Sequence, residues 1–234
     1  MGISIDPAAW PGFLAVYEAV ALTLLATVLG LRKWRKVSDD DLRAARRYFA
    51  SFFFIGAVGP LALLLVLRTH PLASLGLIGI RFGRWPLGLI LTLAAIPVAL
   101  LAGSIGSRDP AMRAFYPFSK KACADVRTFI AYEIRYFLLY YTGWEFVFRG
   151  VLFFPLVETA GLIPALAFQT IASTLFHIGH PDTEIYAALG AGFAFGLIAW
   201  STGSILYPIL IHASIGIATD TFIFRRMVKE RSAA

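Results

Sequence analysis

Long apolar stretches, separated by short polar or basic segments, run through most of the chain. They predict membrane-spanning helices at about 11–31, 48–67, 86–106, 128–157, 163–180, 185–201 and 204–224. Most approach the length of about 20 apolar residues that an α-helix needs to cross a bilayer. The fourth stretch is longer and carries internal charges, so it could form two helices. The pattern predicts an all-α, polytopic transmembrane bundle of about seven to eight spans, with residues 1–234 forming a single membrane domain.

Composition supports lipid as the main solvent. Hydrophobic residues make up 59% of the chain and charged residues 15%, and the mean hydropathy is +0.74. The net charge of +7 comes from basic residues between apolar runs. This placement favours the lipid bilayer as partner and argues against nucleic acid. The single cysteine, Cys123, excludes an internal disulfide and a cysteine-based metal site.

The basic residues also predict an orientation. Most of the 21 lysines and arginines lie within 32–47, 108–127 and 225–231. With seven spans these segments share one side of the membrane, and the positive-inside rule makes that side cytoplasmic. We therefore expect an N-terminus outside and a cytoplasmic C-terminus. Short basic connections without soluble domains favour a prokaryotic plasma membrane.

Ionisable side chains inside the predicted spans are the candidate site residues. A charge at the bilayer centre costs about 2.5–3.5 kcal/mol on insertion scales, so each one needs a partner, water or a function. The second half of the chain holds a cluster of them: Glu145, Arg149, His177, His180, Glu184, His212 and Asp220.

Helical spacing predicts which of these groups meet. Glu145 and Arg149 are four residues apart, so they share a helical face and can form an ion pair. The spacing of His177, His180 and Glu184 also predicts convergence on one helical face.

Asp220 lies two turns after His212, near the end of the last predicted span. We expect it at a solvated helix end.

One carboxylate and two imidazoles from three helices form a set that can activate water. Glu145 can act as a general base, while His180 and His212 can polarise a carbonyl or stabilise an oxyanion. The same three side chains could hold Zn²⁺ with one open position. Metal dependence stays open, with metal-free chemistry preferred, and the H-E-x-x-H string of soluble zinc proteases is absent.

Three sequence blocks resemble the CPBP family of intramembrane proteases, which includes CAAX prenyl endopeptidases and bacteriocin-immunity relatives. That family is marked by E-E-x-x-x-R, F-x-x-x-H and H-x-x-x-N on successive membrane helices. The corresponding blocks here are WEFVFRG at 144–150, FHIGH at 176–180 and HASIG at 212–216. The resemblance covers about residues 140–220, inside a motif-bearing core of about 128–224, and implies a helical membrane endopeptidase.

Two positions depart from the family pattern. Trp144 replaces the first glutamate, which the resemblance would make the water-activating base. Gly216 replaces the asparagine expected to help hold the oxyanion, and His177 could supply some of the missing polarity. Three interpretations stay open. Glu145 could serve as the base in a single-glutamate subgroup, the chain could be an inactive relative, or the resemblance could mislead about function.

The leading hypothesis is an intramembrane endopeptidase acting on a membrane-embedded, lipidated or hydrophobic-tail protein or peptide. Glu145 would activate water and Arg149 would fix Glu145. His180 and His212 would orient the water or stabilise the oxyanion, with His177 and Glu184 in support. The first alternative is an immunity or adaptor protein that binds a peptide or partner in the same cavity. The second is a transporter, against which the chain shows no inverted repeat.

Overall fold

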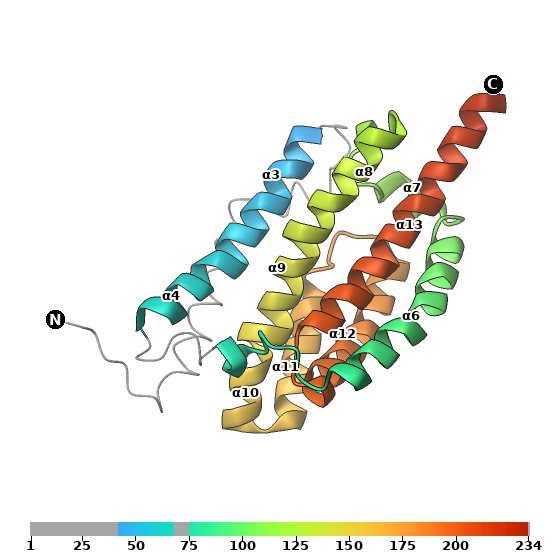
Figure 1. The fold of residues 1–234 in the computed structure, drawn as a ribbon. Coiled ribbons are helices and arrows are strands. Elements are labelled where there is room, and N and C mark those ends of the chain that lie inside the picture. Colours follow the sequence, from blue (N-terminus) through green and yellow to red (C-terminus); the bar gives the residue numbers. More distant parts are fainter. Residues whose placement is uncertain (1–41, 68–74, 234) are drawn as a thin grey trace.

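The computed structural model describes residues 42–67 and 75–233, and within these ranges the chain is helical and forms no extended strand (Figure 1). The predicted first span at 11–31 lies outside the described residues. The helical elements are α3 (Leu42–Phe53), η3 (Phe54–Val58), α4 (Gly59–Leu67), η4 (Leu75–Ile78), α6 (Trp85–Gly106), α7 (Pro110–Phe115), η5 (Lys120–Cys123), α8 (Val126–Arg135), η6 (Tyr136–Tyr141), α9 (Thr142–Glu145), η7 (Phe146–Val151), α10 (Phe153–Ala160), α11 (Leu162–Leu175), α12 (Asp182–Thr202) and α13 (Leu206–Ala233).

Every predicted apolar stretch that falls on described residues forms helix over most of its length. Among these residues, α6, α12 and α13 are each long and apolar enough to cross a membrane. The all-α class is therefore confirmed. The number of seven to eight spans stays a prediction, because several apolar helices are shorter than a full crossing.

The fourth apolar stretch is one nearly continuous helical run from α8 to α10, so the alternative of two separate helices is not realised. Asp125 caps its N-terminus by accepting hydrogen bonds from the Thr128 hydroxyl and backbone N–H, which lower the pKa of Asp125. Two π-helical segments, η6 and η7, flank the single α-turn that carries Trp144 and Glu145. Such π segments are frequent at functional sites because they change the direction of side chains.

The fifth predicted span was wrong at its C-terminal end. The helix α11 stops at Leu175 rather than continuing to residue 180. Gly179 adopts a positive φ of 101°, and Pro181 precedes α12. Both features favour a turn over further helix, because only glycine adopts this conformation readily and proline lacks the N–H that a helix interior requires. His177 and His180 consequently lie in a turn and not on a helical face.

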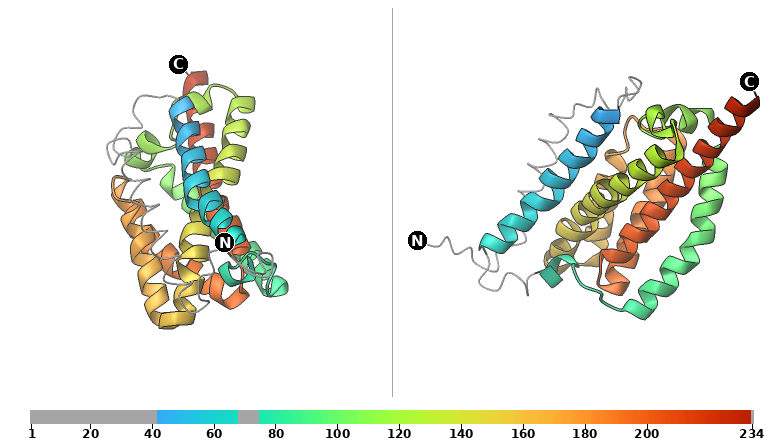
Figure 2. Two further views of the ribbon diagram at one scale, coloured as in Figure 1. Left: turned by 90° about the vertical axis from the view of Figure 1, so that its left-hand side faces the viewer. Right: turned by 45° about the horizontal axis from the view of Figure 1, so that its top comes forward.

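The helices pack side by side with α3 and α6 at opposite edges and α13 between them in front of α11 and α12 (Figures 1 and 2). Aromatic rings fill the space between α3 and the middle helical run. Phe49 stacks on Tyr136 with ring centroids 4.6 Å apart, and Phe52 stacks on Trp144 at 5.5 Å. This packing fixes the wall of the bundle on which the first motif block lies.

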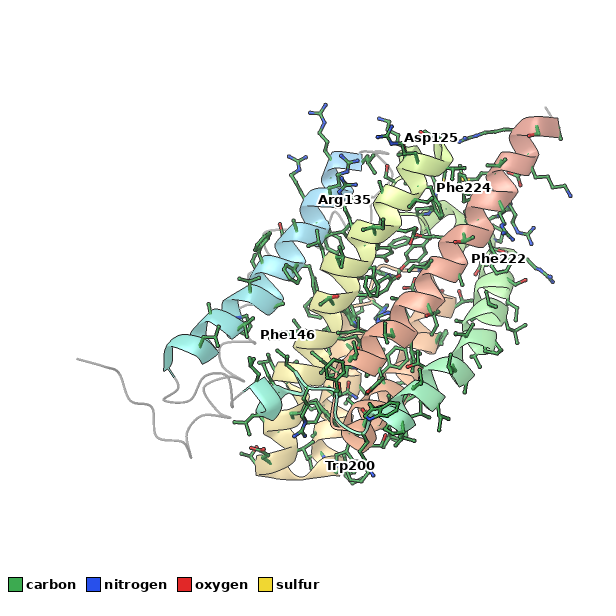
Figure 3. The ribbon with its side chains drawn as sticks, in the orientation of Figure 1. Asp125, Arg135, Phe146, Trp200, Phe222 and Phe224 are labelled. Atoms are coloured by element: carbon green, nitrogen blue, oxygen red, sulfur yellow. The ribbon has the colours of Figure 1, made fainter. Side chains whose placement is uncertain are left out.

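The described parts of the three basic segments lie at one end of the bundle. The beginning of α3, the beginning of α8 and the end of α13 are together in Figure 1. Figure 3 shows Asp125 at this end and Trp200 at the opposite one. The arrangement agrees with basic segments that share one membrane side, while its assignment to the cytoplasm stays a prediction.

The connection before α6 fixes the start of α13 at the opposite end. The backbone N–H of Ile205 donates to the Gly79 carbonyl at 3.0 Å, and that of Arg84 donates to the Thr202 carbonyl at 2.7 Å. The Tyr207 hydroxyl donates to the Phe82 carbonyl at 2.7 Å. These bonds hold the first turn of the helix that later carries His212.

The close contact between α6 and α13 gives a test of the packing. A Cβ at Gly103 would lie 2.8 Å from backbone atoms of Ala218 and Thr219. Gly103→Ala should therefore lower the free energy of unfolding by about 1–3 kcal/mol, because the two backbones must separate. Gly190→Ala is the matched control, since nothing lies within 4 Å of that Cβ.

Thermal unfolding of the detergent-solubilised proteins measures both changes. Gly190→Ala should be neutral or raise stability by up to about 1 kcal/mol, because alanine favours helix over glycine. Equal effects of the two substitutions would contradict the close approach of α6 and α13.

Candidate active site

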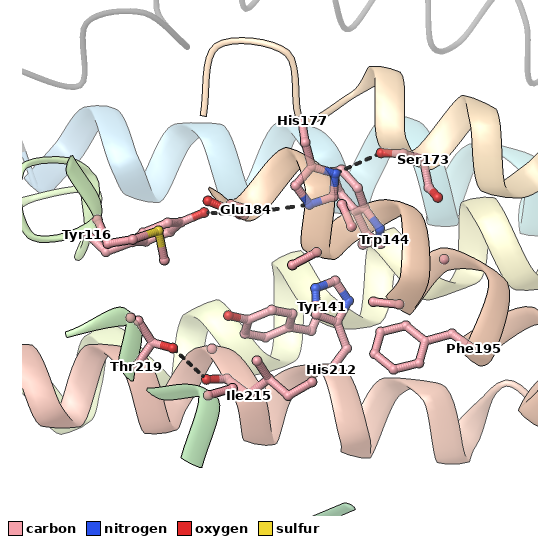
Figure 4. A pocket seen from close by; sticks show the side chains of 18 of the residues that line it. Tyr116, Tyr141, Trp144, Ser173, His177, Glu184, Phe195, His212, Ile215 and Thr219 are labelled. Atoms are coloured by element: carbon pink, nitrogen blue, oxygen red, sulfur yellow. Dashed lines mark hydrogen bonds and ion pairs between the residues drawn. The ribbon is translucent and has the colours of Figure 1, made fainter. Parts of the chain in front are cut away.

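A cavity of about 390 Å³ lies among the helices, and α6, α12 and α13 all contribute to its wall. Small aliphatic and aromatic side chains make up most of this wall. The polar and charged groups stand out against it and come from opposite sides (Figure 4). They include Tyr116, Tyr141, Arg149, His177, Glu184 and His212.

Glu145 and Arg149 form the ion pair that their spacing predicts. The Arg149 Nε lies 3.2 Å from Glu145 Oε2, and both side chains are buried. The Arg149 guanidinium also lies over the Phe195 ring of α12, 5.4 Å from its centroid, and reaches the Gly192 carbonyl. The buried cation therefore connects the motif-bearing turn of α9 and η7 to α12.

His212 approaches the same carboxylate from α13. Its Nδ1 lies 2.6 Å from Glu145 Oε1. Because a carboxylate accepts hydrogen bonds, this contact assigns the proton to Nδ1 and leaves the lone pair of a neutral ring on Nε2. His212 lines the cavity and its side chain is 19% exposed, whereas Glu145 is fully buried behind it. Glu145 thus reaches the cavity through His212.

A second polar cluster forms where the turn after α11 meets the first turn of α12. His180 Nδ1 lies 3.0 Å from Glu184 Oε1, and His177 Nε2 lies 3.8 Å from the same oxygen. His177 Nδ1 donates to the Ser173 carbonyl at 2.8 Å. The predicted convergence of these side chains is present, although it results from the turn at Gly179.

Tyr116 completes this cluster and was missed from the sequence. Its hydroxyl donates to Glu184 Oε1 at 2.6 Å. Burial, and then the charge of Glu184, raises the pKa of Tyr116 well above its usual value, so the phenol stays protonated and can donate. No local pattern could have identified Tyr116, because it follows α7 in a connection remote in sequence from Glu184.

The predicted metal trio of Glu145, His180 and His212 does not meet at one point. Among the described residues, the acidic and imidazole ligand atoms that gather within 4.8 Å of one another belong to His177, His180 and Glu184. The chain reversal at Gly179 directs His180 to Glu184, while His212 is engaged by Glu145.

Aromatic side chains occupy the space at the two positions that depart from the family pattern. Trp144 is 1% exposed and presents its ring edge to His177, with centroids 4.8 Å apart. A Cβ at Gly216 would lie 1.5 Å from the Tyr141 hydroxyl oxygen. Tyr141 therefore occupies the space that a larger side chain at residue 216 would need. Tyr141 lies four residues before Glu145, and this helical spacing is the sequence signal that could have identified it.

Part of this chain matches a known protein family. Residues 127–218 match the family model described as Type II CAAX prenyl endopeptidase Rce1-like. This confirms the resemblance to the CPBP family. No curated protein and no solved structure matches the chain.

The Rce1-like segment includes all eight residues singled out from the motif blocks and their spacing: Trp144, Glu145, Arg149, His177, His180, Glu184, His212 and Gly216. Tyr116 lies before it. The cavity is therefore completed by a residue outside the matched segment.

Asp220, just after the Rce1-like segment, is not at a solvated helix end. The helix α13 continues to Ala233, so Asp220 falls within its length and is 1% exposed. It lies beside Glu133 of α8. Within the described residues, the only hydrogen-bond partner of either carboxyl group is the other one. The sequence expectation failed because it ended the helix near residue 224.

The Glu145–Arg149 pair gives a stability test within the Rce1-like segment. Arg149→Met should lower the free energy of unfolding by about 3–5 kcal/mol, because it leaves a carboxylate buried without its cation. The double variant Glu145→Leu/Arg149→Met should recover much of this loss. Thermal unfolding in detergent compares the two. A single variant as stable as the native protein would contradict the compensating role of Arg149.

Proposed function

We propose that the chain is an intramembrane endopeptidase that hydrolyses a peptide bond of a lipidated or otherwise hydrophobic substrate inside the cavity. One observation carries this proposal. His212, held by the buried Glu145–Arg149 pair, lines the same cavity as Glu184 and His177, and its Nδ1 bond to Glu145 leaves the Nε2 lone pair free. The match to a family of prenyl endopeptidases supports the same class of reaction.

The reaction starts with proton transfer from water to His212. A neutral imidazole with a free Nε2 is a general base, and Glu145 stabilises the imidazolium that results. The water oxygen forms a bond to the carbonyl carbon of the substrate. The imidazolium then returns the proton to the leaving nitrogen as the carbon–nitrogen bond breaks. Glu145 is in this scheme a positioning residue, because it is buried and acts through His212.

Tyr141 is suited to stabilise the oxyanion. It lines the cavity, and its hydroxyl occupies the space next to Gly216, where the family pattern has an asparagine. A phenol donates one hydrogen bond, as an asparagine amide can. Tyr141 of η6 thus supplies the polar group that α13 lacks at Gly216.

The cavity wall favours an apolar substrate. Alanine, isoleucine, glycine, methionine and aromatic residues form most of the lining, and the polar groups include Thr219 and Asp220 as well as those around the two imidazoles. The family that residues 127–218 match is that of a CAAX prenyl endopeptidase. A peptide with a prenylated cysteine near its C-terminus is therefore the first substrate to test.

A second function, binding without cleavage, is favoured by one observation. Trp144 occupies the position of the family's first glutamate, and its indole packs among Phe52, Phe148 and His177. An immunity or adaptor protein would use the same cavity to hold a hydrophobic peptide. The cleavage assay below distinguishes the two functions.

Replacing the proposed base should abolish most of the activity. His212→Ala is expected to lower kcat for a prenylated fluorogenic peptide by about 10²- to 10⁴-fold, the usual contribution of a positioned acid–base group. The protein is assayed in liposomes. Ser214→Ala is the matched control, because the Ser214 hydroxyl bonds the Leu210 carbonyl within α13.

Cleavage that persists in His212→Ala at the native rate would reject the assignment of the base. If the native protein binds the labelled peptide but leaves it intact, the adaptor function is favoured instead. Circular dichroism and gel filtration of each variant exclude misfolding as the cause of lost cleavage.

The proposed role of Tyr141 predicts a selective effect on kcat. Tyr141→Phe should lower kcat by about 10²- to 10³-fold with little change in KM, because the lost donor acts only on the transition state. Tyr186→Phe is the control, since Tyr186 is 78% exposed. An unchanged kcat, or a loss confined to KM, would remove Tyr141 from the oxyanion site.

A further inference from the structure

We propose that His177, His180 and Glu184 form a binding site for a divalent metal ion, suited to Zn²⁺, at the edge of the cavity, whose wall includes His177 and Glu184. The three ligand atoms lie within 4.8 Å of one another. The site differs from the trio expected from the sequence, and it is formed by the turn after α11 and the first turn of α12. Metal binding there does not depend on the reaction proposed above.

The hydrogen bond of His177 prepares one ligand atom. Since the Ser173 carbonyl can only accept, Nδ1 of His177 carries the proton and Nε2 holds a lone pair. Metal-bound histidines usually donate a hydrogen bond from the N–H of their second ring nitrogen to a carbonyl or carboxylate in this way. Nε2 points to Glu184 Oε1 across 3.8 Å, so two acceptor atoms face each other. A cation between them removes their repulsion.

His180 supplies the second nitrogen at a matching distance. Its Nδ1 lies 3.0 Å from Glu184 Oε1. In a tetrahedral zinc site, metal–ligand bonds of about 2.0–2.2 Å place neighbouring ligand atoms about 3.3–3.5 Å apart. The separations of 3.0 and 3.8 Å around Glu184 Oε1 lie on either side of this value. Binding the ion would displace the Nδ1 proton that His180 shares with Glu184 to solvent, and small rotations of the side chains would bring the ligand atoms to these distances.

Glu184 carries two further signs of a ligand. Its second oxygen, Oε2, is buried without a hydrogen-bond partner among the described residues. The Tyr116 hydroxyl donates to Oε1 and orients the carboxylate, as an outer-shell group does for a metal ligand. Two imidazoles and a carboxylate select zinc over magnesium, which prefers oxygen ligands alone.

The open coordination position would be available to the cavity. Figure 4 shows His177 and Glu184 facing each other at its edge, across from His212 and Tyr141. Three protein ligands leave one position of a tetrahedral ion for water or a substrate carbonyl. The chemical class of the ligand is thus a borderline-soft divalent cation with one exchangeable site.

Metal titration of the full chain tests the site. The protein is purified in detergent micelles, freed of any affinity tag, stripped with a chelator and titrated with Zn²⁺ or with Co²⁺ as a spectroscopic probe. We expect one ion per chain and the intense visible absorption of tetrahedral Co²⁺. His177→Ala and Glu184→Gln should each weaken binding on the order of 100-fold or more, since even outer-shell losses cost about 10- to 100-fold.

His212→Ala is the matched control, because it removes a cavity histidine outside the three ligands and should bind Zn²⁺ like the native protein. Thermal unfolding of the metal-free proteins shows whether each variant folds. Added Zn²⁺ should raise the Tm of the native protein and of His212→Ala, but not that of His177→Ala.

The metal site is overturned if the native protein binds Zn²⁺ no more tightly than His177→Ala and Glu184→Gln, or if His212→Ala loses the ion equally. The proposed protease function fails separately. Stoichiometric Zn²⁺ binding without peptide cleavage retains the site and rejects the reaction, while cleavage without specific binding retains the reaction and rejects the site.

Discussion

The architecture of the cavity depends on one buried carboxylate. Glu145 lies fully inside an apolar bundle, where an isolated charge is costly, and Arg149 and His212 compensate it. Each of these partners has its own support, since Arg149 lies over Phe195 of α12 and His212 belongs to α13. Charge compensation therefore brings the helical run that carries Glu145, α12 and α13 to one point. The position of His212 follows from this compensation.

At positions 144 and 216 the polar side chains of the family pattern are absent, and aromatic side chains fill the space. The aromatic group at 144 is Trp144 itself, and the one at 216 comes from Tyr141. Trp144 packs on Phe52 of α3, and Tyr141 covers the backbone at Gly216. Since a side chain larger than hydrogen at 216 would collide with Tyr141, positions 141 and 216 are physically coupled. Loss of the family's asparagine is thus part of a rearranged wall in which a phenol replaces an amide.

Local rules predicted much of the fold and part of the site. Apolar stretches identified α6, α12, α13, the run from α8 to α10 and most of α11, and the four-residue spacing identified the Glu145–Arg149 pair. The turn at Gly179 was missed because Phe176 and Ile178 extend the apolar stretch in the sequence, although Gly179 and Pro181 are signals of a turn. The contacts of Tyr116 with Glu184 and of Asp220 with Glu133 depend on packing between distant segments, which periodicity does not encode.

Two polar clusters lie where the family pattern has a single glutamate pair to serve the cavity. A carboxylate that lies behind the cavity wall, engaged by an arginine and an imidazole, does not meet water in the cavity directly. Glu145 is in this state, and Trp144 offers no carboxylate beside it. Glu184 reintroduces one on the opposite wall, held by Tyr116 and His180. Loss of the first glutamate therefore leaves both an imidazole, His212, and a carboxylate, Glu184, in the cavity wall, so the departure at 144 is compatible with the proposed hydrolysis.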